Sequence, residues 1–113
     1  MLVLRPSRTH GIGVFTLRPI AKGARIQLFR KDDWRFVARP QGWEKKMCEH
    51  FGIEDDDGGY HCPRFWNRMS IGWYINHSDR PNVENRRIVF RAARRIRAGE
   101  ELTVDYDLLE GGG

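Results

Sequence analysis

Two segments near opposite ends of the chain share the pattern Ile-x-x-Gly-x-x-apolar, and this repeat limits the folds open to the sequence. It spans Ile20 to Ile26 in the first segment and Ile96 to Leu102 in the second, and a phenylalanine precedes each, Phe15 and Phe90. Because glycine permits a tight turn between two strands, each segment predicts a β-hairpin. Two such turns predict a compact antiparallel β protein with small sheets. Chance similarity of two common glycine turns is the alternative.

Short runs of β-branched and aromatic residues, bounded by turn residues, dominate the rest of the chain. They predict strands at residues 2–4, 13–17, 25–29, 34–37, 88–90 and 102–106. One segment has a helical period instead, because Trp43, Met47 and Phe51 recur every four residues. A helix is therefore predicted from about Gln41 to Phe51, with Gly52 at its C-terminal end.

The length of 113 residues predicts a single domain with a sizeable core. Its apolar fraction of 40% and charged fraction of 31% are those of a soluble globular protein. No apolar run approaches the ~20 residues that a membrane span needs, and the first residues lack a signal-peptide core. We expect a cytoplasmic protein, or a nuclear or chromatin-associated one if the source is eukaryotic or a eukaryotic virus.

The chain is basic, with 20 Lys and Arg against 15 Asp and Glu and a net charge of +5. Basic proteins attract nucleic acid. Here the arginines are spread along the whole sequence, with short clusters only at 86–87 and 94–95. A solvated surface is the preferred interpretation, and direct nucleic-acid binding is not expected.

Cys48 and Cys62 are too few for a multi-bridge framework, which fits a reducing compartment. His50 and His61 stand near them, so a zinc site is an alternative. Neither pair has the CxxC or HxxxH spacing that presents two ligands to one ion. No metal site is predicted.

Three further segments carry candidate site residues. In HGIGVF, residues 10–15, the glycines permit either a bulge at a strand entrance or close backbone approach to a ligand. In YINHSDRPN, turn chemistry explains the second half, but Asn76 and His77 end an apolar segment and need hydrogen-bond partners. The third segment, EELTVDYD, predicts a strand that ends at Tyr106 between carboxylates, and on its own Tyr106 is interpreted as a core or rim tyrosine. The chain has no Ser-His-Asp order, phosphate loop or HExxH, so nothing supports hydrolase or kinase chemistry.

Together and in this order, HGIGVF, WYINHSDRPN and IRAGEELTVDYD resemble the SET-domain protein-lysine methyltransferases. The usual family forms are G-x-G-x-[FG], R-[FY]-I-N-H-S-x-x-P-N and G-E-E-L-x-x-D-Y. The most specific feature is NHSxxPN followed by the DY tyrosine, Tyr106, 30 residues after Asn76. The resemblance covers about Leu2 to Asp107 and is closest in length to the minimal SET proteins of bacteria and of a chlorella virus.

The resemblance implies a mainly β SET-domain (β-clip) fold, with small curved sheets, one short helix and a C-terminal pseudoknot. The pseudoknot is one of the rare departures from unknotted chain connections, and it would bring Tyr106 next to Asn76 and Gly13. One SET domain would span residues 1–107, and residues 108–113 would form a short tail. Within the domain, residues 1–40 would be the N-terminal SET region, residues 41–69 an insert with the helix and an acidic loop, and residues 70–107 the C-terminal SET region.

The implied activity is enzymatic: transfer of methyl groups from S-adenosylmethionine to a lysine side chain of a protein, such as a histone or another basic protein. Tyr106 is the implied catalytic residue. The implied cofactor-binding residues are Gly11, Ile12, Gly13, Trp73, Tyr74, Asn76, His77 and Tyr106. The implied substrate-binding residues are Tyr60, Trp66 and Val104, although core packing explains Tyr60 and Trp66 equally well.

The chain departs from the family pattern in three places. Trp73 stands where the family usually has Arg or Lys, so a cofactor contact is lost or replaced by stacking. Val104 replaces a usual Phe or Tyr, which would permit a higher degree of methylation unless another tyrosine fills the gap. Residues 108–113 carry neither post-SET cysteines nor an aromatic residue. Either a second subunit closes the lysine channel, which favours a homodimer, or the site is more open.

Two further expectations concern partners. The four carboxylates of residues 54–57 would attract a basic protein substrate, and a solvated acidic loop is the alternative. The competing function is a catalytically weak SET-fold module that binds a basic peptide or protein.

Overall fold

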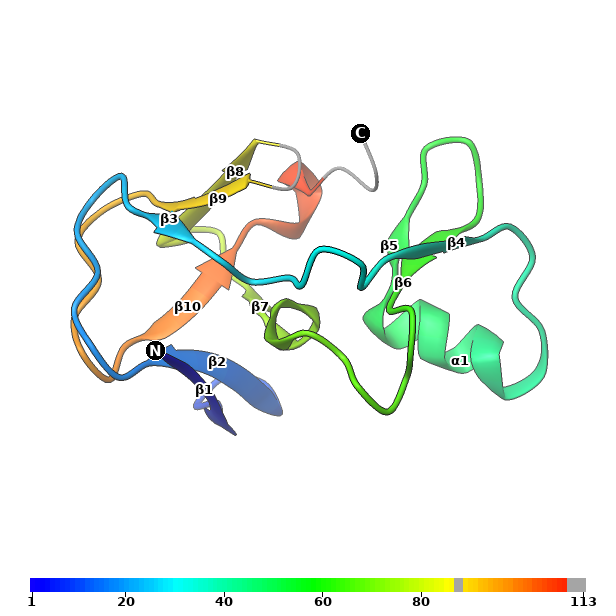
Figure 1. Cartoon of the computed structure of the whole chain (residues 1–113), viewed down its shortest axis with the longest axis horizontal. Helices are drawn as coiled ribbons and strands as arrows, with labels where there is room; N and C mark the ends of the chain where they lie inside the picture. Colours follow the sequence, from blue (N-terminus) through cyan, green and yellow to red (C-terminus); the bar gives the residue numbers. More distant parts are fainter. Residues whose placement is uncertain (87–88, 110–113) are drawn as a thin grey trace.

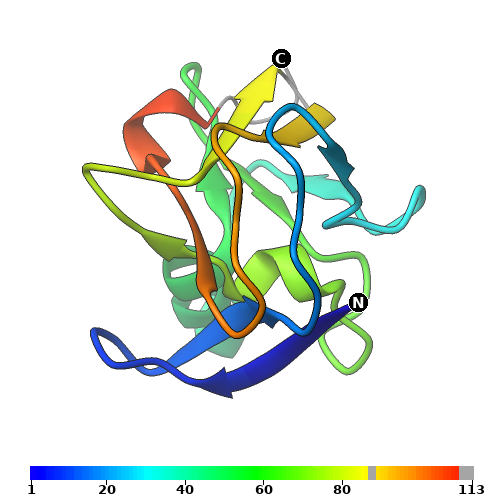
Figure 2. The same cartoon turned by 90° about the vertical axis from the view of Figure 1, so that its left-hand side faces the viewer.

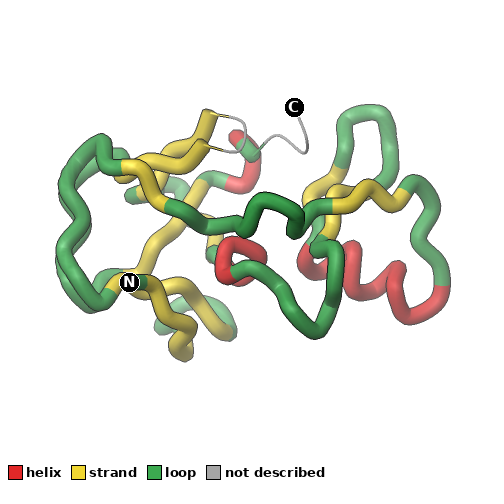
Figure 3. The backbone as a smooth tube through the Cα atoms, viewed as in Figure 1, coloured by secondary structure: helices red, strands yellow, loops and turns green. Residues whose placement is uncertain are grey.

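Ten short strands in three small sheets form most of the regular structure in the computed structural model, which describes residues 1–86 and 89–109 (Figure 1). The 3-10 helices η1 and η2 and one α-helix complete it (Figure 3). The elements are β1 (Leu2–Pro6), β2 (Ile12–Thr16), β3 (Arg25–Ile26), β4 (Arg35–Val37), α1 (Gly42–Phe51), β5 (Ile53–Glu54), β6 (Tyr60–Cys62), η1 (Ile71–Tyr74), β7 (Asn76–His77), β8 (Val83–Arg86), β9 (Val89–Ala92), β10 (Glu101–Val104) and η2 (Tyr106–Leu108).

The strand orders are β1-β2-β10-β7, β3-β9-β8 and β4-β6-β5. This arrangement confirms the predicted mainly β fold of small sheets with one short helix. Each predicted strand overlaps an observed one, although residue 88 lies outside the described residues. Sequence reasoning missed β5, β6, β7 and β8, because strands of two to four residues give too little alternation to detect.

The repeated Ile-x-x-Gly pattern forms two corners that pair with each other, so the prediction of two hairpins was wrong. Ile20 N donates to Ile96 O at 2.8 Å, and Ile96 N donates to Ile20 O at 2.9 Å. The strands on either side of each corner pair with those of the other corner, β2 with β10 and β3 with β9. A glycine turn between two apolar runs specifies a change of direction, but it does not specify which strand is the partner.

The two corners are related by an approximate two-fold symmetry. Gly23 and Gly99 have φ angles of +83° and +84°, a conformation that favours glycine. Gly23 N donates to Ala92 O at 2.8 Å, and Gly99 N donates in the equivalent way to Thr16 O at 2.7 Å. Figure 2 faces this end of the molecule and shows the two segments side by side.

The apolar positions of the repeat enter one core between the sheets. Ile96 and Leu102 have no exposed surface, and Ile26 is 6% exposed. The other buried members of this cluster are Val14, Leu28, Ile75, Val83, Phe90, Ala92 and Val104. The repeated pattern therefore encodes both the corners and the core that they enclose.

The predicted helix is confirmed as α1, although the first residue of the predicted apolar stripe faces solvent. Trp43 is 67% exposed, and the buried residue of the helix is Cys48, whose Sγ lies 2.9 Å from Cys62 Sγ of β6. Both thiols are free, and burial raises the pKa of Cys62. Gly52 ends the helix at an ordinary φ of −71°. Glycine is needed there for space, since a Cβ would lie 2.5 Å from Cys48 O.

A buried carboxylate, Asp33, ties the segment after β3 to the C-terminal half of the chain. Its oxygens accept from Arg64 N at 3.0 Å, from Ser70 N at 2.5 Å and from Trp73 Nε1 at 3.1 Å. Burial by itself would raise the pKa of Asp33, but the donors from Ser70, Arg64 and Trp73 hold it below its ordinary value. Asp33 therefore stays charged and fixes the position of Trp73.

No helix among residues 1–86 and 89–109 is long and apolar enough to cross a membrane. Within the same residues, no three His, Cys, Asp or Glu side chains are grouped closely enough to hold a metal ion.

We predict that Glu100→Gln destabilises the protein at neutral pH and not at pH 2. Glu100 accepts from Arg94 Nη2 at 2.8 Å and from Arg97 N at 3.0 Å, and the Arg94 guanidinium lowers the pKa of Glu100 to about 2. Because the folded pKa lies below the ordinary value of 4.5, this contribution is complete above about pH 4.5 and disappears as the pH falls toward 2. Denaturant unfolding should show a loss of ~2 kcal/mol at pH 7.

The matched control is Glu84→Gln, an exposed carboxylate on β8. At pH 7 its free energy of unfolding should stay within about 0.5 kcal/mol of the wild type, as is usual for a surface substitution. Equal losses for the two variants, or a loss for Glu100→Gln that does not change with pH, would contradict this assignment.

Candidate active site

Two adjoining clefts open beside the end of α1, η1 and η2. The first, about 420 Å³, is lined by His10, Gly11, Ile12, His50, Phe51, Trp73, Tyr74, Ile75, Asn76, His77 and Tyr106. The second, about 310 Å³, shares His50, Phe51, Trp73, Ile75 and Tyr106 and extends to Phe29, Gly52, Ile53, Glu54, Gly72, Phe90 and Leu109. Tyr106 therefore lies where the two clefts meet.

Strand β10 brings the separate motifs together. It pairs antiparallel with β2 on one side and parallel with β7 on the other, with Thr103 opposite Asn76 and Val104 opposite His77. Ser78 N extends this contact by donating to Val104 O at 2.9 Å. The segment that ends at Tyr106 therefore lies beside residues 76–78, as the expected pseudoknot requires.

The Asn76 side chain fastens the turn between β1 and β2 to β10. Its Nδ2 lies 3.0 Å from His10 O, 3.1 Å from Ile12 O and 2.9 Å from Glu101 Oε2. Ser7 Oγ donates to the other Glu101 oxygen at 2.7 Å. Protein acceptors thus occupy the amide nitrogen of Asn76, which leaves Oδ1 as its group for a ligand. Sequence reasoning did not identify the role of Glu101.

The two glycines of the first motif are needed for different reasons. Gly11 has a φ of +49°, which fits the expectation of a turn at a strand entrance. Gly13 is needed for space, because a Cβ there would lie 2.2 Å from Glu101 Oε2 and 3.1 Å from Asn76 Nδ2. Gly13 thus permits close approach of the Glu101 side chain and lies behind the first cleft, whereas Gly11 and Ile12 line it.

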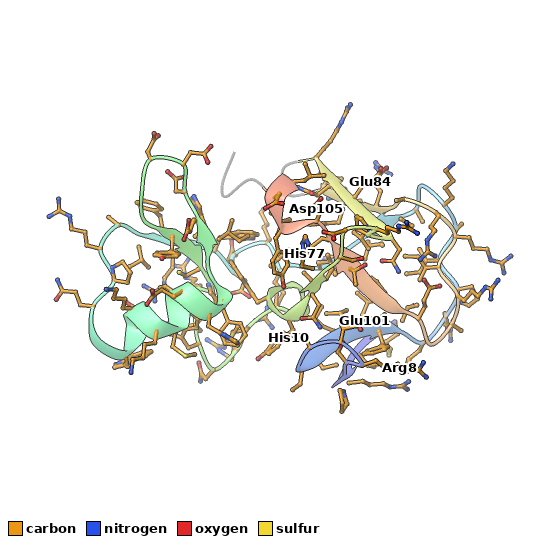
Figure 4. The ribbon with its side chains drawn as sticks, turned by 180° about the vertical axis from the view of Figure 1, so that it is seen from behind. Arg8, His10, His77, Glu84, Glu101 and Asp105 are labelled. Atoms are coloured by element: carbon orange, nitrogen blue, oxygen red, sulfur yellow. The ribbon has the colours of Figure 1, made fainter. Side chains whose placement is uncertain are left out.

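The His77 ring positions the backbone of Tyr106. Its Nδ1 accepts from Tyr106 N at 3.0 Å, so the ring proton is on Nε2, which donates to Asp79 Oδ1 at 3.0 Å. The two rings also pack at 5.2 Å between centroids. Figure 4 shows His77 next to Asp105, the residue that precedes Tyr106. The side chain of His77 therefore has a direct role in holding the backbone at Tyr106.

The Tyr106 phenol is a neutral group with a fixed hydrogen bond. Its Oη donates to Ile75 O at 2.5 Å. Burial raises the pKa of Tyr106 above its ordinary value, and the charge of Glu101 raises it further. Because the phenol donates its one proton to Ile75 O, only the lone pairs of Oη are available to a ligand at the junction of the clefts. It can accept a hydrogen bond and orient a donor.

Aromatic rings form one wall of the first cleft. Trp73 donates to Asp33 and packs edge-on against Phe29, with 5.1 Å between ring centroids. It is tilted against Trp34, with 4.7 Å between ring centroids. Phe51 packs against Tyr74 at 5.5 Å. As far as the chain is described, neither cleft is lined by a Lys or an Arg, although the net charge of the protein is +5.

Three predicted substrate residues lie elsewhere and line neither cleft. Tyr60 lies in β6, opposite Val37 and Glu54. Trp66 donates through Nε1 to Glu44 of α1 at 3.2 Å. Val104 is fully buried, because alternation along β10 points it into the core together with Leu102. The structure therefore does not bring these residues to the site, where His50, Phe51 and Ile75 lie instead.

Comparisons with known proteins agree with this geometry. The family model of the SET domain matches residues 11–107. Among solved structures, the chain is similar to the crystal structure of a "putative histone methyltransferase" from Plasmodium falciparum, with a TM-score of 0.66 and 22% identity over 93% of this chain and 91% of that chain. This likeness shows the SET fold. A comparison with curated proteins gives no match.

We predict that Gly13→Ala breaks the contact between Glu101 and Asn76. The added Cβ overlaps Glu101 Oε2, so the variant should lose ~1–3 kcal/mol of unfolding free energy. Faster amide exchange at residues 10–12 should accompany this loss. Removing the obstructing carboxylate should relieve the clash, so Gly13→Ala should cost less when it is introduced into Glu101→Ala. A double-mutant cycle measures this coupling, and strictly additive costs would contradict the assignment.

Proposed function

The chain belongs to the SET-domain family, which is typical of protein-lysine methyltransferases, and we propose that it transfers methyl groups from S-adenosylmethionine to a lysine of a protein substrate. The observation that carries the proposal is electrostatic. Although the protein has a net charge of +5, no Lys or Arg is among the described residues that line the two clefts. The phenol oxygen of Tyr106 lies where the clefts meet. Such clefts suit a cationic cofactor and a substrate amine.

The residues of the first cleft fit S-adenosylmethionine. The volume of about 420 Å³ lies within the usual range of small-molecule sites. The aromatic side chains of Phe51, Trp73 and Tyr74 suit a sulfonium cation, which aromatic faces attract. The turn at residues 10–12, together with residues 76–77, would hold the polar parts of the cofactor. When bound, the cofactor would supply a methyl group carried on its sulfonium.

The second cleft fits the aliphatic part of a lysine side chain. Phe29, Phe51, Ile53 and Phe90 supply apolar walls, and Glu54 supplies a carboxylate. Lysine has an ordinary pKa near 10.4, and removal of the amine from water favours the neutral, nucleophilic form. Tyr106 Oη would then accept an N–H from this amine and align its lone pair, so positioning contributes much of the rate.

The second cleft and the acidic loop of residues 54–57 suit a substrate of basic character. We propose a basic, lysine-containing protein, with Glu54 and the exposed Asp56 and Asp57 orienting it. Asp55 is less available, because His61 Nε2 lies 2.9 Å from its Oδ1. Histones as substrates, and a second copy of the chain that closes the lysine channel, stay predictions.

The direct test is incubation with radiolabelled S-adenosylmethionine and a mixture of basic proteins. Label should be transferred to lysine in at least one protein. Binding of the cofactor without transfer to any protein would point instead to a binding module of the same fold.

We predict that Tyr106→Phe lowers kcat by about 100-fold or more and leaves the Kd of the cofactor within a few-fold. Phenylalanine keeps the ring against His77 but removes the oxygen that would orient the amine. Tyr60→Phe is the matched control, because Tyr60 lies outside both clefts. A Tyr106→Phe enzyme with wild-type kcat would remove this residue from the mechanism.

We further predict that Glu54→Gln raises KM for a basic peptide several-fold without changing kcat, and that the effect shrinks as salt increases. Glu54 lines the second cleft, whereas the exposed Asp32 lines neither cleft and lies outside the acidic loop of residues 54–57. Asp32→Asn is therefore the charge-matched control. A KM that shifts equally in both variants would assign the effect to general charge and not to the cleft.

A further inference from the structure

One end of the molecule carries an excess of positive charge equal to that of the whole chain. We define the corner face as residues 17–25 and 91–101, the two paired corners with the end of β9. It holds two carboxylates, Glu100 and Glu101, and seven basic residues: Arg18, Lys22, Arg25, Arg91, Arg94, Arg95 and Arg97. The excess of five equals the net charge of +5, so the rest of the chain is balanced.

The fold brings these residues together from two distant segments of the sequence. All seven basic side chains are exposed. The antiparallel bridge between Ile20 and Ile96 places the segment around Lys22 beside that around Arg94, and the segment around Arg18 beside that around Arg97. Figure 4 shows nitrogen-tipped side chains projecting from this end, at the right of the view.

Most of this charge is not neutralised within the described residues of the chain. Glu100 pairs with Arg94, and the Glu101 carboxylate is bound by Ser7 and Asn76. Arg91 Nη1 donates to Gly23 O at 3.1 Å, which holds this guanidinium over the first corner. The remaining cations face solvent, with like charges on neighbouring segments. A polyanion would relieve this repulsion and release its counterions.

We propose that the corner face docks on the phosphate backbone of duplex nucleic acid without reading its bases. Six of the seven cations are arginines, whose planar fork matches phosphate oxygens. An acidic protein partner would require apolar anchors at the centre of the contact, and Leu17 is the one large apolar side chain exposed in the described face. The arginines looked scattered in the sequence because their clustering depends on the pairing of the corners.

The proposed docking leaves the clefts open, since no residue of the corner face lines either of them. It therefore stands independently of the methyl-transfer proposal. A duplex held at one end of the molecule would not compete with occupants of the clefts.

The test is fluorescence anisotropy with a labelled DNA duplex of about 20 base pairs, measured at salt concentrations from about 50 to 200 mM. The logarithm of the binding constant should fall linearly with the logarithm of salt, with a slope of about −0.9 for each phosphate neutralised. Replacing Arg18, Lys22, Arg95 and Arg97 by Gln should weaken binding more than about ten-fold. The slope should become less negative by about 3–4. These side chains are exposed and make no hydrogen bond or ion pair among the described residues.

The control replaces the same number of exposed cations outside the corner face, Lys31, Arg39, Lys45 and Lys46, by Gln. This variant has the same net charge and should bind within about three-fold of the wild type. Equal losses in the two variants would overturn the proposal, as would no binding by the wild type at the lowest salt concentration. Competition by polyglutamate as strong as that by unlabelled duplex would also overturn it.

A second measurement needs no substitution in the corner face. Amide resonances of residues 17–25 and 91–101 of the wild-type protein should shift in a saturable way when the duplex is added. Shifts confined to other regions of the chain would contradict the proposal even if the four-Gln variant failed to fold.

Discussion

The reciprocal hydrogen bonds between Ile20 and Ile96 are the constraint on which the rest of the structure depends. They hold the two glycine corners together, so that the strands next to one corner pair with those next to the other, β2 with β10 and β3 with β9. This pairing fixes one edge of β10 and leaves the other edge to β7. The chain that leaves β10 must then pass beside Asn76 and His77. The candidate site is thus a consequence of the way the corners pair.

Polar side chains convert this topology into a fixed site. Asn76 and Glu101 hold the first turn against β10, and His77 holds the backbone of Tyr106. Asp33 orients Trp73 from the opposite side. Each of these bonds joins segments far apart in sequence, and each contributes ~0.5–1.5 kcal/mol, with more where a charge takes part. Removing any one of them should loosen the clefts before it unfolds the protein.

The sequence predicted features that depend on local patterns or on a specific motif. The helix and the six strands are of this kind, and so is the presence of Asn76 and Tyr106 in one cleft, which the family resemblance implied. Gly13 lies beside Asn76 but lines neither cleft. Features that depend on the choice between distant partners were not predictable, and the hairpin interpretation failed for this reason. Trp43 was expected on the buried side of the helix but is exposed, because Cys48 is the residue that α1 buries. Val104 lies in the core because it points to the same side of β10 as the buried Leu102. Asp33 gave no signal, since its donors are distant in sequence, from Arg64 to Trp73.

The central claim is that segments separated by nearly the whole chain form one cofactor site. Titration of ¹⁵N-labelled protein with S-adenosylmethionine tests this claim most directly. We expect saturable shifts, with a single Kd, for the amides of Gly11, Ile12, His77 and Tyr106, and little change at Gly23 and Gly99 in the corners. No saturable shift, or shifts limited to residues outside the first cleft, would contradict it.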